Sequence, residues 1–422
     1  MKLILPIALL VAVASLTAKE PLKMNPVPAE TLQYAESGGN VYQMRFRYDL
    51  RGGAHTNAGD TLGRLLAKSL ASYLGDHSTD DSFVKQIQFL LEGPNTISAV
   101  GSYPSQHEHI FLSSLIVARE TPKLWERFSD EEKKKIDLLM KAHLVGNAFT
   151  TSDQTNPGRT APPAMDGSKN HNRAWNPNYQ EGMIGGLILG AVWLGPKEAQ
   201  AFLDSYDHVK FTEQLKEAGL TNTYEIFTWK ANNPDSEAPT PEEINEALHG
   251  FRYFDMDLTN PMEIFLKLSA NTYGAIVAAG LNNGEGKEDP SGNIGGKIAQ
   301  NADKVPNIGK KGMLLEFASI DGGGPRSCAG YSYGGIRTNL AKQIAMMVTG
   351  HLDYKHPQWK EIFEQIRVGN EDIIFKLEEG YISFSHGKSA TQPTAFDGRD
   401  DKTITRDLWQ KVVLPYHESQ TK

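Results

Sequence analysis

The sequence predicts a mainly α-helical protein, folded as an α/α toroid of helical hairpins in a single large domain with few short strands. After Ala58, apolar residues recur at three- and four-residue steps over most of the chain, which is the period of an amphipathic helix. Roughly a dozen such segments follow one another without a short sequence repeat, which favours a toroid over a solenoid or a four-helix bundle. Strand-like alternation is limited to Tyr42–Tyr48 and Tyr381–Ser385.

The N-terminal segment, residues 1–18, has the pattern of a secretory signal peptide. One lysine precedes an apolar run from Leu3 to Ala14 that is too short to span a bilayer comfortably, and small residues follow it. The only cysteine is Cys328, so the chain can form no internal disulfide. Together these features predict an exported protein, periplasmic or secreted, with residues 19–422 as its α/α-toroid domain.

The helices expected along the chain follow from the apolar periodicity and from local start signals, such as the capping box that Ser129 and Glu132 would form. Two long polar loops, Thr150–Asn178 and Asn282–Asn293, interrupt them, and such loops in a compact domain are often functional. The expected helices are Leu62–Tyr73, Phe83–Leu91, Glu108–Glu120, Ser129–Gly146, Tyr179–Leu194, Pro196–Asp204, Thr240–His249, Pro261–Gly280, Tyr331–Gly350, His356–Val368 and Gly369–Glu378.

The charge distribution excludes one class of partner. The net charge is −8, from 43 basic and 51 acidic side chains that are mixed along the chain. A nucleic-acid-binding protein usually gathers its Lys and Arg residues on one face. Only short basic runs such as Lys133–Lys135 occur here, and such a run is typical of the solvated side of a helix. The sequence therefore predicts no nucleic-acid partner, and no membrane insertion of the mature chain.

The glycine-rich segment Asp321–Gly330 is the best catalytic candidate. It contains Arg326 and leads to Tyr331 and Tyr333, at the start of an expected apolar helix. Glycines allow backbone conformations that other residues avoid, and connecting loops often carry function. A flexible turn followed by ordinary packing tyrosines would also explain the pattern.

A second candidate cluster stands at the end of the first long polar loop. It contains Asn170, His171, Asn172, Arg173 and Trp175. The amides and the imidazole can donate hydrogen bonds to a carboxylate, Arg173 offers a planar fork for the same group, and Trp175 offers a flat face for a sugar ring. The alternative is an asparagine-rich turn that caps a helix and places Trp175 in the core.

Three weaker candidates for substrate binding complete the set. His107 and His109 enter an expected helix, His249 and Tyr253 precede an Asp-rich turn, and Arg337 follows the tyrosine loop. A structural role would explain the histidine clusters equally well. The four-residue histidine spacing of a helical zinc site is absent, so the sequence predicts neither a metal nor another cofactor.

One chemistry requires Asn, His, Arg and Tyr together. In β-elimination of a uronic acid polymer, the C5 proton is removed and the glycosidic oxygen leaves from C4. Asn170, His171 and Arg326 would stabilise the enolate-like intermediate through its carboxylate. Tyr331 or Tyr333 would act as base and acid, with its pKa lowered by neighbouring cations. A single tyrosine serves when both groups leave from one face, as in polymannuronate or glucuronan.

The Asn170-His171 pair and the Arg326 to Tyr333 segment resemble the corresponding motifs of the α/α-toroid polysaccharide lyases. In length and helix content the chain is most similar to polysaccharide lyase family 38. This resemblance implies a glucuronan or alginate lyase with an acidic polysaccharide as substrate. We expect it to need no cofactor and to act as a monomer or weak oligomer.

Two other classes remain open. An α/α-barrel glycoside hydrolase would need paired carboxylates, which Asp255 with Asp257, or Glu181 with Asp166, could supply. A non-catalytic glycan-binding protein is the other class.

Overall fold

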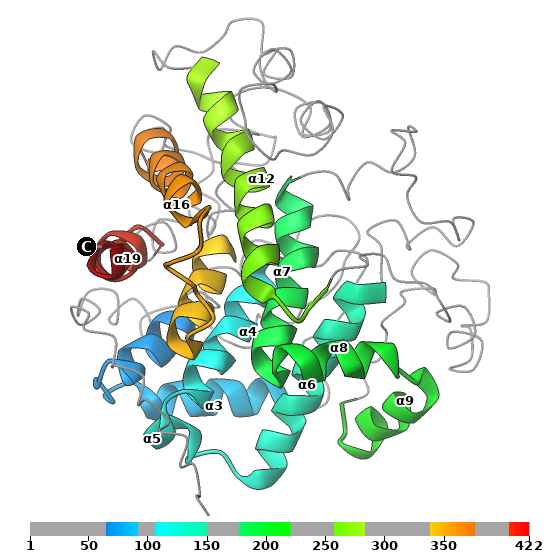
Figure 1. Cartoon of the computed structure of the whole chain (residues 1–422). Helices are drawn as coiled ribbons and strands as arrows, with labels where there is room; N and C mark the ends of the chain where they lie inside the picture. Colours follow the sequence, from blue (N-terminus) through cyan, green and yellow to red (C-terminus); the bar gives the residue numbers. More distant parts are fainter. Residues whose placement is uncertain are drawn as a thin grey trace, which may run out of the picture.

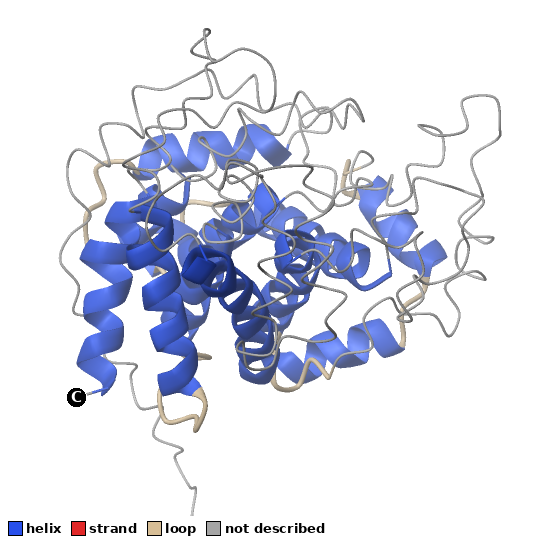
Figure 2. Cartoon of the chain, turned by 90° about the horizontal axis from the view of Figure 1, so that it is seen from above, coloured by secondary structure: helices blue, strands red, loops and turns tan. Residues whose placement is uncertain are grey.

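The computed structural model describes residues 65–91, 106–149, 177–220, 257–282, 338–375 and 405–421. Within these ranges the chain forms helices joined by turns and contains no strand (Figure 2), so the mainly α-helical fold class is confirmed. None of the helices in these ranges is both long and apolar enough to cross a membrane. Closure of the helices into a toroid stays a prediction.

The labelled helices in chain order are α3 (Asp80–Leu91), α4 (Gln106–Arg119), α5 (Pro122–Trp125), α6 (Asp130–Phe149), α7 (Pro177–Leu194), α8 (Pro196–Asp204), α9 (His208–Glu217), α12 (Pro261–Asn282), α16 (Trp359–Arg367), η6 (Val368–Phe375), η7 (Leu408–Val413) and α19 (Leu414–Thr421). Residues 65–73 and 338–349 are also helical. Figure 1 shows α7 and α12 side by side at the centre of the body, with α16 and α19 on one flank and α8 and α9 on the other.

Local signals placed several helix ends correctly. The predicted capping box precedes α6, where the Ser129 N–H donates to Glu132 Oε2 at 2.7 Å and the Glu132 N–H donates to Ser129 Oγ at 3.2 Å. Between α7 and α8, Gly195 takes a φ of 96° and Pro196 occupies the first turn of the next helix. The expected bounds of α8 agree with those of the structure.

The chain after His356 differs from expectation. Two helices separated at Gly369 were expected, but α16 begins at Trp359 and continues directly into η6, which is a π-helix. Gly369 lies inside this element, and a Cβ at this position would be 2.6 Å from Tyr273 Cδ1 of α12. The absence of a side chain therefore allows η6 to pack closely against α12, and the glycine does not end a helix. The helix α9 and the C-terminal pair η7 and α19 were not expected at all.

The relative directions of the helices follow from their contacts. Near the start of α4, His109 faces Gly185 of α7, and at its end Arg119 donates to the Trp193 carbonyl, so these two helices run parallel. The α6 helix runs antiparallel to α7, because Leu144 faces Gly190 while Asp137 accepts from the Trp193 indole.

The same reasoning places the helix at 338–349. Asn339 contacts Ser269 in α12, whereas His356, farther along the chain, contacts Glu263 near the start of α12. Residues 338–349 therefore run antiparallel to α12. Figure 1 shows that α7 is antiparallel to α12 as well. The helices α4 and α7 consequently start toward one end of the body, which we call the starting end, and residues 338–349 run in the same direction.

The opposite end of α7 is held by an aromatic cluster. The Arg119 guanidinium lies 4.1 Å from the centroid of the Trp193 ring, and the Trp193 indole N–H donates to Asp137 Oδ1 at 3.0 Å. Trp125 packs edge-on against Trp193. Burial lowers the pKa of Arg119, although two nearby carboxylates oppose the shift. These contacts tie α4, α5, α6 and α7 together away from the starting end.

Candidate functional site

Three of the candidate clusters lead directly into the helices of the starting end. Ser105 precedes α4 and Asn176 precedes α7, whereas Arg337 comes just before the described part of the helix at 338–349. Helix N-termini carry a partial positive charge, so the parallel helices α4 and α7, which both start toward this end, favour anions there. The fold thus brings the helices that follow these distant sequence segments to the same part of the molecule.

Two nitrogen-bearing side chains meet at Gly185 in the middle of α7. A Cβ on Gly185 would lie 2.8 Å from His109 Nδ1 and 2.7 Å from Lys342 Nζ. Both side chains are fully buried, with 0% of their surface exposed. The glycine therefore provides the space in which an imidazole from α4 and an ammonium from the helix at 338–349 approach α7.

Next to this point, a chain of buried hydrogen bonds crosses three helices. Asn339 Nδ2 donates to Ser269 Oγ of α12 at 3.0 Å, and Gln343 Nε2 donates to Asn339 Oδ1 at 2.8 Å. His417 of α19 donates from Nε2 to Gln343 Oε1 at 2.7 Å and accepts at Nδ1 from the Tyr354 hydroxyl at 3.0 Å. Because all donors point in one direction, the bonds polarise one another and fix the helix at 338–349.

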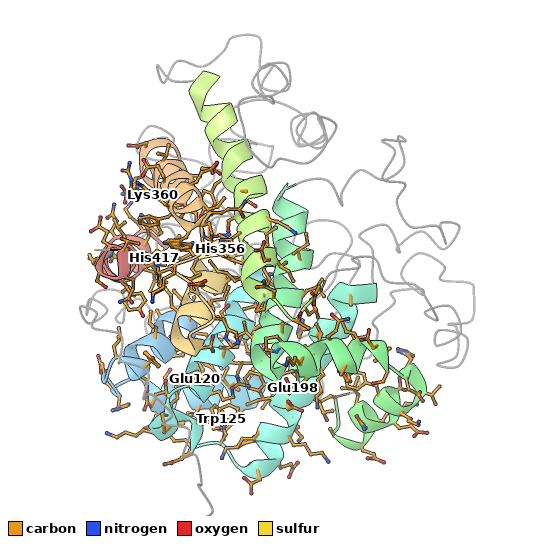
Figure 3. The ribbon with its side chains drawn as sticks, in the orientation of Figure 1. Glu120, Trp125, Glu198, His356, Lys360 and His417 are labelled. Atoms are coloured by element: carbon orange, nitrogen blue, oxygen red, sulfur yellow. The ribbon has the colours of Figure 1, made fainter. Side chains whose placement is uncertain are left out.

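The aromatic surroundings of His417 keep this chain in one protonation state. Trp359, Phe363 and Tyr354 pack around the imidazole. Burial lowers the pKa of His417 to about 3, so the ring is neutral, as the donor and acceptor roles above require. Figure 3 shows His417 and His356 on the side of α16 and α19, away from Glu120, Trp125 and Glu198.

A buried amide lies on the π-helix. Asn370 of η6 is fully buried, and among the residues that the structure describes neither its Oδ1 nor its Nδ2 has a hydrogen-bond partner. It follows Gly369, which contacts Tyr273 of α12. Single turns of π-helix often occur at functional sites, and an unsatisfied buried amide costs about 1–3 kcal/mol, so this residue is a further candidate.

The structure places few of the candidates named from sequence. His109 lies in the first turn of α4, as described above, and His107 lies in the same turn with its side chain outside the described set. The remaining candidates fall outside the described residues: Asn170, His171, Asn172, Arg173, Trp175, His249, Tyr253, Arg326, Tyr331, Tyr333 and Arg337.

After the segment with His249 and Tyr253, the described chain resumes at Asp257. Asp257 lies next to the first turn of α12 and therefore away from the starting end. Asp257 is exposed, and its Oδ1 accepts from the Thr259 backbone N–H at 2.9 Å and from the Thr259 hydroxyl. Hydrogen bonds from Thr259 lower the pKa of Asp257. This carboxylate forms a turn that starts a helix, which gives no support to a hydrolase role for it.

Sequence reasoning missed Lys342, Asn339, Gln343, His417 and Asn370. The first three recur at three- and four-residue steps within an otherwise apolar helix, and this signal could have marked a polar stripe that faces inward. Within the described ranges, no three His, Cys, Asp or Glu side chains gather in a way that could hold a metal ion.

Comparison with known proteins points to one enzyme class. A Bacillus sp. protein named gellan lyase is 25% identical to the chain over 370 residues, which are 83% of this chain. The chain spans only 14% of the length of that relative. Gellan lyase is a polysaccharide lyase. No family model matches the chain, and no solved structure matches it significantly.

Proposed function

We propose that the chain is a polysaccharide lyase that cleaves an acidic, uronate-containing polysaccharide by syn β-elimination. The similarity to gellan lyase over most of the chain is the observation that carries the proposal, since it supports the enzyme class and an acidic substrate. Export to the periplasm or the medium, as residues 1–18 suggest, and closure of the helices into a toroid belong to the same proposal.

The proposed roles follow the chemistry of the reaction. Asn170, His171 and Arg326 hold the uronate carboxylate and stabilise the negative charge that develops when C5 loses its proton. Tyr331 or Tyr333 takes that proton and returns one to the C4 oxygen as the glycosidic bond breaks. The close approach of Lys342 to Gly185 of α7 supports the pairing, because α7 and residues 338–349 come after the two motifs in the chain.

Substrate class within the lyases is part of the proposal. The relative is named for gellan, whereas the resemblance to polysaccharide lyase family 38 suggested glucuronan or alginate. We place gellan first because that similarity extends over most of the chain. Glucuronan and polymannuronate follow, since both allow syn elimination by one tyrosine.

The test is a scan of the purified protein against gellan, glucuronan, polymannuronate, polyguluronate and pectin. A lyase produces a double bond conjugated with the carboxylate, so ultraviolet absorbance rises without consumption of water. We expect this signal on at least one syn substrate, and we expect Tyr331→Phe or Tyr333→Phe to reduce kcat by 100-fold or more.

Tyr354→Phe is the matched control, because this partly buried tyrosine bonds to His417 and lies outside the two sequence motifs that carry the proposed roles. It should retain kcat within about twofold, apart from a loss of stability near 1 kcal/mol. Full activity in both loop variants would exclude the tyrosine mechanism. Release of saturated sugars would indicate a hydrolase instead.

A further inference from the structure

The C-terminal helix α19 is held to the body mainly by one histidine. Among its described residues, only His417 is buried, and 0% of the surface of this residue is exposed. Leu414 and Tyr416 are partly buried, and the other residues of the helix are exposed. Most of the stability of a helix in a protein comes from tertiary packing. The place of α19 therefore depends on the contacts of this imidazole.

The preceding helix η7, from which α19 continues directly, is anchored in a different way. Trp409, Val412 and Val413 are fully buried. The Trp409 indole N–H also donates to Glu371 Oε1 of η6 at 2.8 Å. Burial of apolar side chains does not depend on protonation, whereas an imidazole gains a proton in mild acid. The two consecutive helices thus differ in what holds them to the body.

The site that receives the His417 ring favours its neutral form. Trp359 and Phe363 of α16 place their ring centroids 5.1 and 5.4 Å from that of the imidazole. One ring nitrogen donates to Gln343, and the other accepts from the Tyr354 hydroxyl. A proton on the accepting nitrogen would force Tyr354 to turn its hydroxyl hydrogen away. It would also put a positive charge where water does not reach.

The described groups around the ring offer no negative charge to a protonated His417. The nearby titratable groups are Tyr354, which bonds to the ring, and Tyr416, which packs against Tyr354 at 5.8 Å. A phenol stays protonated below about pH 10, so both are neutral in acid. Burial is the only cause that lowers the pKa of His417. The charged side chains on the same elements are exposed or lie against other groups, namely Lys342, Lys360, Glu361, Glu364, Lys411 and Glu418.

We propose that α19 is an acid-sensitive switch, in which the neutral His417 ring holds the helix in its aromatic site and protonation of that ring releases the helix while η7 stays packed. In the released helix the ring is in water, where histidine gains its proton near pH 6.5. Each pH unit below this value favours the released form about tenfold, until the docked ring is protonated too. Release uncovers Trp359 and Phe363, and it removes the end of the hydrogen-bond chain that runs through Gln343.

Hydrogen exchange of the full chain tests the switch, measured for separate peptides from pH 7.5 to pH 4.5 and corrected for the intrinsic exchange rate. We expect the opening equilibrium constant of residues 416–421 to rise about 100-fold between pH 6.5 and pH 4.5. Residues 408–413 should change by less than about threefold, because apolar packing holds them.

Two variants assign the effect to one ring. His417→Gln keeps a donor and an acceptor at this position but does not titrate, so the rise for residues 416–421 should disappear. His208→Gln removes another buried histidine, in α9 on the other flank of the body (Figure 1), and should keep the wild-type rise.

A pH-independent opening of residues 416–421 in the wild-type chain would overturn the inference, and so would an undiminished rise in His417→Gln. Joint opening of residues 408–413 and 416–421 would show that acid unfolds the body as a whole and would also overturn it. This last comparison uses only the wild-type chain, so it decides the question even if His417→Gln does not fold.

Discussion

Substitution of Gly185 by alanine tests the candidate site with a change of one methyl group. The added Cβ would lie 2.7 Å from Lys342 Nζ, 2.8 Å from His109 Nδ1 and 2.9 Å from Lys342 Cδ. Carbon atoms need roughly 3.5 Å or more to each heavy-atom neighbour, so both side chains must retreat by several tenths of an ångström or more. The perturbation is thus aimed at the two nitrogens.

The stability cost can be worked from two opposing terms. Overpacking of a well-filled interior costs about 1–3 kcal/mol. Replacement of glycine by alanine inside a helix returns about 1 kcal/mol. The free energy of unfolding should therefore fall by about 0–2 kcal/mol, and the protein stays folded at assay temperature. Misplacement of a site group by as little as 1 Å can cost about 100-fold in rate, so we expect kcat/KM to fall at least tenfold.

The same helix supplies a matched control. A Cβ on Gly190 would lie 2.7 Å from Leu144 Cδ1 and 2.9 Å from Leu144 Cβ, which is a comparable clash against an apolar side chain. Gly190→Ala should therefore lose similar stability while kcat/KM stays within about threefold of the wild-type value. The assay is ultraviolet absorbance of the unsaturated product on gellan, with melting temperatures measured in parallel. Equal losses of activity in the two variants would refute a special role for the Gly185 contact.

Three further predictions concern stability. Asn339→Ala removes the donor to Ser269 Oγ and the acceptor of Gln343 Nε2, so chemical denaturation should show a loss of about 1–3 kcal/mol; an unchanged midpoint would contradict this. Burial lowers the pKa of His208 to about 4 and that of His417 to about 3, so below pH 6.5 the unfolded chain binds more protons than the folded chain. The melting temperature should therefore be highest above pH 6.5 and fall toward pH 4. In His208→Gln it should fall less steeply. Trp193→Phe removes the indole hydrogen bond, which should cost about 1–2 kcal/mol without altering kcat/KM, because this residue is about two helical turns from Gly185.

Sequence periodicity and capping signals predicted the positions of helices because both depend on residues within a few positions of one another. The bounds of α8 follow from Gly195 and Pro196, and the capping box before α6 from Ser129 and Glu132, since each pair acts within a single turn. The short amphipathic α9 was missed because its apolar stripe extends over few turns, so its period was a weak signal.

The candidate site shows the limit of the same reasoning. Sequence alone predicted chemistry in the segments before α4, α7 and residues 338–349, but no local pattern shows that these three helices run in the same direction. The buried polar groups on the helices, such as Lys342, were overlooked because lysine is normally a surface residue. A local sequence pattern does not show which distant helix packs against a given side chain and buries it.

By itself, then, the sequence determined the helical class and most helix positions, because propensity and capping act within a few residues. Only the tertiary structure decided that α4, α7 and residues 338–349 run in the same direction, and that Gly185 makes room for His109 and Lys342. The structure also contains a continuous π-helix through Gly369, where the sequence predicted a break, and this residue packs against Tyr273. These features arise from packing between distant segments, where close approach and burial outweigh local preference.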